Sequence, residues 1–250
     1  MEQIRANTVL PAVRQPVALT TADGLRLVGE LVVPTVDQPR ATIVCVHPLP
    51  TAGGMMDSHL FRKAAWRLPA LAGIAVLRFN TRGTHSPAGR SEGEFSEAVA
   101  EGLDLAAAVE RVSQEGLPVP WLVGWSFGTD VILKHPEVGP VAGAVLVSPP
   151  VRYTSQAELA EWGRVGLSTT ALIPELDDFL RPPEAVERFK VAPNVALVPV
   201  DGAGHLWVGE ANVRIVLNEI VREVAPEALN PETGSLPTQW EGPMERWNDL

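Results

Sequence analysis

Apolar residues occur along the chain in short runs separated by amphipathic stretches. Continuous apolar runs predict strands covered on both faces at 41–47, 74–80, 119–123, 141–147, 170–174 and 195–200. Apolar residues at helical spacing predict helices at 58–72, 95–115, 183–189 and 210–224. Strands that alternate with helices indicate an α/β fold, with a mostly parallel sheet and helices on both of its faces.

The N-terminal part of the chain predicts a hairpin. Two runs, at 17–20 and 25–33, flank the turn Thr21-Ala22-Asp23-Gly24. Asp-Gly between two such runs is typical of a β-hairpin. Together with the six runs above, its two strands predict an eight-stranded sheet within one domain that spans 1–225.

The last part of the chain has a different character. Residues 226–250 are rich in proline and glycine and contain Trp240 and Trp247. We expect an irregular tail packed on the domain through its tryptophans, and a tail that binds a partner is the alternative.

Composition limits the classes of partner. The net charge of −10 argues against nucleic acid or an anionic membrane. The single cysteine, Cys45, lies inside an apolar run, so we expect it to be buried, and it cannot form a disulfide within the chain. The N-terminus lacks an apolar core and no run approaches about 18 apolar residues, which predicts a cytoplasmic protein without a signal peptide or membrane span.

The segment Gly124-Trp125-Ser126-Phe127-Gly128 is the strongest chemical signal. It joins the predicted strand 119–123 to a predicted helix at 127–134 without a loop. A serine at such a joint adopts strained backbone angles, and small residues on each side let the strand and helix approach. Its hydroxyl is exposed at the carboxyl edge of the sheet, which suits a nucleophile.

A serine nucleophile needs a base and an acid that orients the base. His205 follows the last predicted strand, at the same sheet edge as Ser126 and late in the chain, so we predict that it is the base. His47 ends a strand at that edge but is followed by Pro48. We expect solvated or structural roles for the three other histidines, which are His59, His85 and His135.

The acid is expected just after a strand between the serine and the histidine. Asp177 and Asp178 both follow the strand 170–174, and spacing alone does not separate them. The alternative role for either residue is to cap the next turn through its carboxylate.

The site also needs two backbone N–H donors for an oxyanion. Phe127 supplies one because it follows the nucleophile. Pro48 and Pro50 have no N–H, which leaves Leu49 as the second donor by elimination. The alternative is that this segment is only a rigid turn.

These features resemble the α/β-hydrolase superfamily, in particular its small esterase-like branch related to dienelactone hydrolases. The resemblance is carried by His47-Pro48-Leu49-Pro50 with Gly53-Gly54, Leu77-Arg78-Phe79-Asn80-Thr81-Arg82-Gly83, Ser91-Glu92-Gly93-Glu94-Phe95, the segment 124–128 and Gly202-Ala203-Gly204-His205. It implies a triad of Ser126, His205 and an aspartate, hydrolysis through an acyl-enzyme, and no metal or other cofactor. It also implies that Arg78, Asn80 and Arg82 belong to the scaffold.

Two departures from the family pattern matter. Residues 84–89 read as an insertion near the site entrance. Where relatives carry G-x-x-D before the acid, this chain has Pro174-Glu175-Leu176-Asp177, which favours Asp177, whereas counting back from Arg181 fits Asp178 as well.

The sequence therefore predicts a carboxylic-ester hydrolase that acts on a small molecule. The segment 151–168 is too short for a large lid, which favours an open site and small or exposed acyl groups. An acyltransferase, thioesterase or peptidase with the same triad is the alternative, as is a non-catalytic binding protein of this fold. The sequence leaves a homodimer open.

Overall fold

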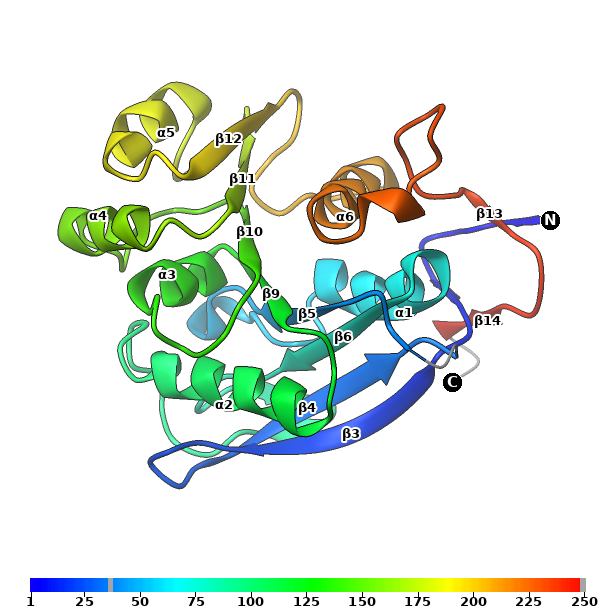
Figure 1. Ribbon diagram of the computed structural model, residues 1–250, viewed down its shortest axis with the longest axis horizontal. Helices are drawn as coiled ribbons and strands as arrows, with labels where there is room; N and C mark the ends of the chain where they lie inside the picture. Colours follow the sequence, from blue (N-terminus) through cyan, green and yellow to red (C-terminus); the bar gives the residue numbers. More distant parts are fainter. Residues whose placement is uncertain (36–37, 248–250) are drawn as a thin grey trace.

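The computed structural model describes residues 1–35 and 38–247 and is built on one eight-stranded sheet (Figure 1). The strands lie in the order β12-β11-β10-β9-β5-β6-β4-β3. Their bounds are β3 Val13–Thr20, β4 Arg26–Val33, β5 Ala41–Val46, β6 Ile74–Phe79, β9 Pro120–Trp125, β10 Gly143–Val147, β11 Thr169–Pro174 and β12 Val195–Val200. The α/β fold with a mostly parallel eight-stranded sheet is confirmed.

The hairpin β3–β4 forms the antiparallel end of the sheet. β4 pairs antiparallel with both β3 and β6, and the pairs from β6 through β12 are parallel. β3 begins at Val13, earlier than predicted, and includes Pro16. An edge strand tolerates a proline because one side of it makes no ladder hydrogen bonds.

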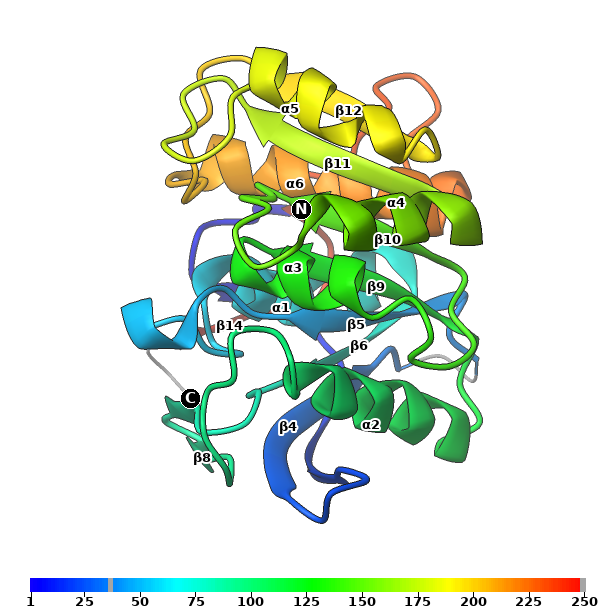
Figure 2. The same ribbon diagram turned by 90° about the vertical axis from the view of Figure 1, so that its left-hand side faces the viewer.

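Helices cover both faces of the sheet, as Figures 1 and 2 show. One face packs against α1 (His59–Ala72) and α6 (Glu210–Val224), and the other against α2 (Glu101–Gln114), α3 (Phe127–Lys134), α4 (Gln156–Val165) and α5 (Pro182–Arg188). The central strands β5, β6 and β10 are buried at every position, which explains their continuous apolar sequences.

The predicted helix at 95–115 is wrong at its start, because α2 begins at Glu101. Glu97 and Ala98 have φ angles of 52° and 65°, and these left-handed conformations cannot continue a right-handed helix. The Glu101 carboxylate accepts a hydrogen bond from the Ser96 N–H at 2.7 Å, which folds this segment back on the helix start.

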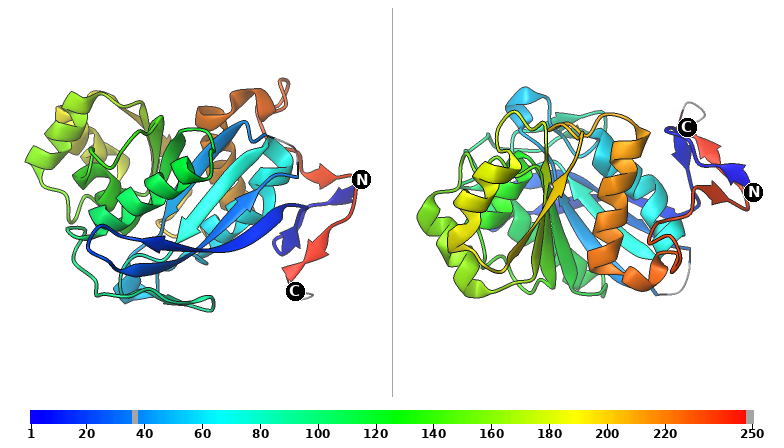
Figure 3. Two further views of the ribbon diagram at one scale, coloured as in Figure 1. Left: turned by 60° about the horizontal axis from the view of Figure 1, so that its bottom comes forward. Right: turned by 90° about the horizontal axis from the view of Figure 1, so that it is seen from above.

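The C-terminal tail pairs with the N-terminus. β13 (Gln239–Trp240) pairs with β1 (Glu2–Gln3), and β14 (Glu245–Arg246) pairs with β2 (Thr8–Val9), as the red and blue segments in Figure 3 show. The Arg62 guanidinium of α1 lies 5.1 Å from the Trp66 ring and 4.6 Å from that of Trp247. The tail is thus attached by short strand pairs, by a cation–π stack and by Leu236, which is buried in the same hydrophobic core as α6.

Polar residues at the end of β6 and just after it hold the neighbouring loops. Arg78 forms ion pairs with Glu30 and Asp57, and Arg82 pairs with Asp104. Asn80 accepts a hydrogen bond from the Met56 N–H at 2.9 Å and donates one to Ser86 Oγ at 2.9 Å. These three residues therefore serve the scaffold, as the sequence resemblance implies.

The insertion at 84–89 lies in a small hairpin, in which β7 (His85–Ser86) pairs with β8 (Gly89–Arg90). The hairpin packs beside β4, and none of its residues lines the pocket described below. Among the helices of residues 1–35 and 38–247, none is long and apolar enough to span a bilayer.

Candidate active site

Ser126 lies at the sharp turn between β9 and α3. Its φ of 52° and ψ of −120° are strained for a residue with a side chain. A Cβ on Gly124 would lie 2.7 Å from the Gly128 carbonyl oxygen, and one on Gly128 would lie 1.9 Å from that of Val46. Both glycines are required because the backbone of α3 touches that of β9 at Gly124 and that of β5 at Gly128.

The structure brings Ser126, His205 and Asp177 together in one hydrogen-bonded chain. His205 Nε2 lies 2.8 Å from Ser126 Oγ, and His205 Nδ1 lies 2.9 Å from Asp177 Oδ2. Because a carboxylate only accepts hydrogen bonds, Nδ1 carries a proton and donates a hydrogen bond to Asp177. The Nε2 lone pair is therefore free to accept a hydrogen bond from the serine O–H.

Asp177, and not Asp178, is the hydrogen-bond partner of the histidine ring. The other Asp177 oxygen, Oδ1, accepts hydrogen bonds from the N–H groups of Phe179 at 2.8 Å and Leu180 at 3.3 Å. Burial alone would raise the pKa of Asp177, but these bonds and the one from His205 hold it below its ordinary value. Asp178 is exposed and lines the pocket.

The loop that carries His205 is held by buried side chains. The His205 carbonyl oxygen accepts hydrogen bonds from Trp125 Nε1 at 3.2 Å and from Ser148 Oγ at 3.3 Å. Trp207 Nε1 in turn donates to Ser148 Oγ at 2.8 Å, and this indole is fully buried. These bonds tie the His205 loop to the ends of β9 and β10, next to Ser126.

The segment with the predicted second oxyanion donor folds back on itself. A short 3-10 turn spans Pro50–Ala52, and the Gly54 N–H donates to the Leu49 carbonyl oxygen at 2.9 Å. Leu49 and Phe127 both line the pocket that contains Ser126. Among the hydrogen bonds of the described residues, neither Leu49 N–H nor Phe127 N–H has a protein acceptor.

His47 lies in a different environment, away from the pocket. It is fully buried, its Nδ1 lies 2.7 Å from the Pro48 carbonyl oxygen, and its Nε2 accepts a hydrogen bond from the Thr81 N–H at 3.0 Å. Burial lowers the pKa of His47 to about 4, although the hydrogen bond to Pro48 opposes this effect. The ring is a neutral structural link between β5 and the segment after β6.

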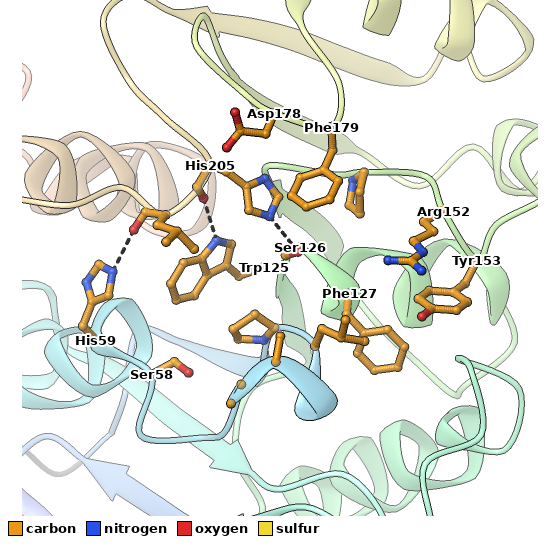
Figure 4. Close-up of a pocket in the computed structure, with 17 residues that line it drawn as sticks. Ser58, His59, Trp125, Ser126, Phe127, Arg152, Tyr153, Asp178, Phe179 and His205 are labelled. Carbon is orange, nitrogen blue, oxygen red and sulfur yellow. Dashed lines mark hydrogen bonds between the residues drawn. The ribbon is translucent and has the colours of Figure 1, made fainter.

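Ser126 opens into a mainly apolar pocket of about 420 Å³ (Figure 4). Its large side chains and histidines are Leu49, His59, Trp125, Phe127, Arg152, Tyr153, Phe179, His205 and Leu206. Arg152 and Asp178 are the charged side chains of its lining. The pocket falls in the size range of small-molecule sites.

Sequence reasoning missed several lining residues. His59, expected to be solvated or structural, donates from Nε2 to the Leu206 carbonyl oxygen at 2.8 Å and packs edge-on against Trp125. Trp125 had a usable signal, since it lies inside the serine motif. Phe179 and Tyr153 had none, because their places depend on how the loops after β11 and β10 fold.

Comparison with known proteins finds relatives in structure alone. No family model and no curated protein sequence matches the chain. An α/β serine hydrolase homologue from Coxiella burnetii superposes with a TM-score of 0.71 and 24% identity, over 84% of this chain and 97% of that one. The protein XC6422 from Xanthomonas campestris, an α/β serine hydrolase without a lid, gives 0.68 and 24%, over 86% and 96%.

The esterase Pf2001 from Pyrococcus furiosus is also similar, with a TM-score of 0.65 and 21% identity, over 85% of this chain and 93% of that one. Together these likenesses show that the chain has the α/β-hydrolase fold. None of the three proteins is described as a dienelactone hydrolase, so that closer relation stays a prediction.

Proposed function

We propose that this protein is a serine hydrolase that cleaves carboxylic esters through an acyl-enzyme on Ser126. The observation that carries the proposal is the chain of hydrogen bonds from Asp177 Oδ2 through the His205 ring to Ser126 Oγ, which ends in an apolar pocket. A nucleophile, its base and an orienting acid at these distances are the parts that acyl transfer requires.

In the first half of the reaction, Ser126 Oγ attacks the ester carbonyl carbon as its proton moves to His205 Nε2. The carbonyl oxygen becomes an oxyanion, which the N–H groups of Phe127 and Leu49 stabilise. His205 then gives its proton to the leaving oxygen as the C–O bond breaks. An alcohol departs, and the acyl group remains on Ser126.

In the second half, water attacks the acyl-enzyme. His205 takes a proton from the water and returns it to Ser126 Oγ, which releases a carboxylic acid. Throughout, the Asp177 carboxylate keeps the histidine in the required tautomer and stabilises the ring when it is charged.

Hydrolysis of short p-nitrophenyl esters tests the proposal, together with labelling by a serine-directed phosphonate and mapping of the labelled peptide. We expect turnover, loss of turnover after labelling, and the label on Ser126. A label on another serine, or no label on the folded protein, contradicts the proposal. Added alcohols, thiols or amines that capture the acyl group in preference to water would instead identify an acyltransferase.

A further inference from the structure

The proposed reaction assigns the two arms of an ester to different sides of Ser126, and the present inference rests on that reaction. The leaving oxygen must lie within reach of His205 Nε2, because it receives its proton from there. The carbonyl oxygen points toward the N–H groups of Phe127 and Leu49. The leaving arm therefore lies on the His205 side, and the acyl arm lies toward the rings of Phe127 and Tyr153, which Figure 4 shows on the other side of Ser126.

The His205 side of the pocket has an apolar rim. The Phe179 ring packs on the imidazole with 4.5 Å between the ring centroids, yet the residue is 55% exposed. Leu206, the next residue after the histidine, is 58% exposed. Large apolar side chains left in water at the mouth of a pocket are typical of a binding surface.

The apolar surface continues beyond the rim. A second hollow of about 260 Å³ lies over the histidine loop and shares Asp178, His205 and Leu206 with the pocket. Leu176 and Val208 line its far part and are 53% and 73% exposed. We call the surface formed by Leu176, Phe179, Leu206 and Val208 the leaving-group groove.

We propose that the leaving-group groove binds the alcohol arm of the substrate, which is therefore an ester of an extended, uncharged, apolar alcohol. The continuity of the groove with the pocket across Leu206 favours this occupant, since a chain attached to the leaving oxygen is led directly onto the groove. Asp178 is the charged residue of the second hollow, and its carboxylate disfavours an anionic chain.

A series of alkyl acetates, from methyl to octyl, tests the proposal at a constant acyl group, with acid release followed by titration. Full burial of a methylene raises binding about fourfold, so an open groove that covers half of each methylene predicts about a twofold rise in kcat/KM per methylene. In the double variant Leu206→Ser, Val208→Ser we expect this rise to be lost.

Two controls sharpen the test. Val119→Ser also removes an exposed valine (53% exposed), but at the opposite edge of the sheet, and should keep the wild-type dependence on alkyl length. A series of p-nitrophenyl esters with acyl chains from acetate to octanoate varies the other arm. The double variant should keep the wild-type dependence on acyl length.

The outcomes separate the possible occupants. The proposal is overturned if kcat/KM of the wild type does not depend on alkyl length. It is also overturned if the double variant keeps the wild-type dependence on alkyl length, or if the double variant loses its dependence on acyl length to the same extent. Activity that rises only above the solubility limit of the ester would indicate a lipid surface. A dimer in sedimentation that Val208→Ser dissociates would indicate a second copy of the chain, and both results overturn the proposal.

Failure of the proposed function is recognised separately, because it appears as absent phosphonate labelling of Ser126 in the wild type. If the double variant does not fold by circular dichroism, Leu206→Ala alone is measured in the same series. If the rise of log kcat/KM with alkyl length is reduced by about half, the proposal is supported, and if this rise is unchanged, the proposal is overturned.

Discussion

Two buried histidines at the same edge of the sheet, His47 and His205, differ in what their ring nitrogens contact. In both, Nδ1 donates and Nε2 accepts. The Nε2 of His47 accepts from the Thr81 N–H and lies 3.1 Å from the hydroxyl of the same residue, which is fully buried, whereas the Nε2 of His205 accepts from the Ser126 hydroxyl, which lines the pocket. The Nδ1 of His47 faces a neutral carbonyl, whereas that of His205 faces the Asp177 carboxylate.

These partners decide what each ring can do. A base must gain a proton during the reaction, so it needs a donor that can lose one and a neighbouring charge that stabilises the resulting cation. His205 has both. His47 faces a neutral carbonyl instead of a carboxylate, and both its ring and the nearby Thr81 hydroxyl are fully buried away from the pocket, so it contributes to folding rather than to chemistry.

Exchanging each histidine for glutamine should separate the two roles most strongly. Without a base we expect His205→Gln to lower kcat by about 10⁴-fold or more in ester hydrolysis. His47→Gln retains an acceptor for the Thr81 N–H and should lower kcat less than about tenfold. Steady-state kinetics on one p-nitrophenyl ester measures both, and a comparable loss in the two variants would contradict the distinction.

Removing the carboxylate partner should make His205 more like His47. Asp177→Asn replaces the charged acceptor by a neutral amide, so the imidazole loses both its fixed tautomer and the charge that stabilises its protonated form. We expect kcat to fall by about 10³- to 10⁴-fold with the fold intact. Kinetics combined with thermal unfolding checks this, and activity within tenfold of wild type would exclude Asp177 as the orienting acid.

The pH dependence of stability should expose the role of His47. Its pKa of about 4 in the folded protein lies below the ordinary histidine value of 6.5. Below about pH 6.5 His47 takes up a proton in the unfolded chain but stays neutral in the folded chain. The stabilising contribution of neutral His47 is thus complete above pH 6.5 and is lost as the pH falls toward 4.

Urea unfolding of the wild type and His47→Gln between pH 7.5 and 5 measures this contribution. The free energy of unfolding of the wild type should fall relative to the variant by up to about 1.4 kcal/mol per pH unit. Parallel curves for the two proteins would show that His47 does not titrate in this way.

The hydrogen bonds that hold the His205 loop should contribute less. Trp207→Phe removes the bond to Ser148 Oγ, and we expect a fall of about tenfold in kcat with little change in KM, because the base is less well placed. Trp162→Phe is the matched control, since this buried indole also donates to a hydroxyl, that of Thr169, at 3.0 Å. Its effect should be confined to stability, and equal losses of kcat in both variants would contradict a positioning role for Trp207.

The smallest effect is expected at Asp178. This carboxylate lies at the pocket surface and is not the hydrogen-bond partner of the His205 ring, so Asp178→Asn should change kcat by less than about threefold and the free energy of unfolding by less than about 1 kcal/mol. A loss as large as that of Asp177→Asn, measured with the same ester, would reverse the assignment of the acid.

Much of the fold follows from the sequence by itself. Strands buried on both faces must be apolar throughout, and helices that cover a sheet must be apolar on one side, so both patterns are visible in the chain. The turn at Ser126 is also visible in the sequence, because it depends on five consecutive residues, of which two are glycines at positions without room for a side chain. The position of His205 after the last strand follows from topology, because parallel strands end at one edge.

Tertiary structure decided the rest, because it depends on contacts between distant residues. Asp177 and Asp178 are neighbours with the same chemistry, and only the path of the loop after β11 turns Asp177 toward a ring 28 residues away. The start of α2 at Glu101 depends on the left-handed conformations of Glu97 and Ala98, which the spacing of apolar residues does not reveal. His47 and His205 are the same amino acid at the same edge, and only their surroundings make one a structural link and the other the proposed base.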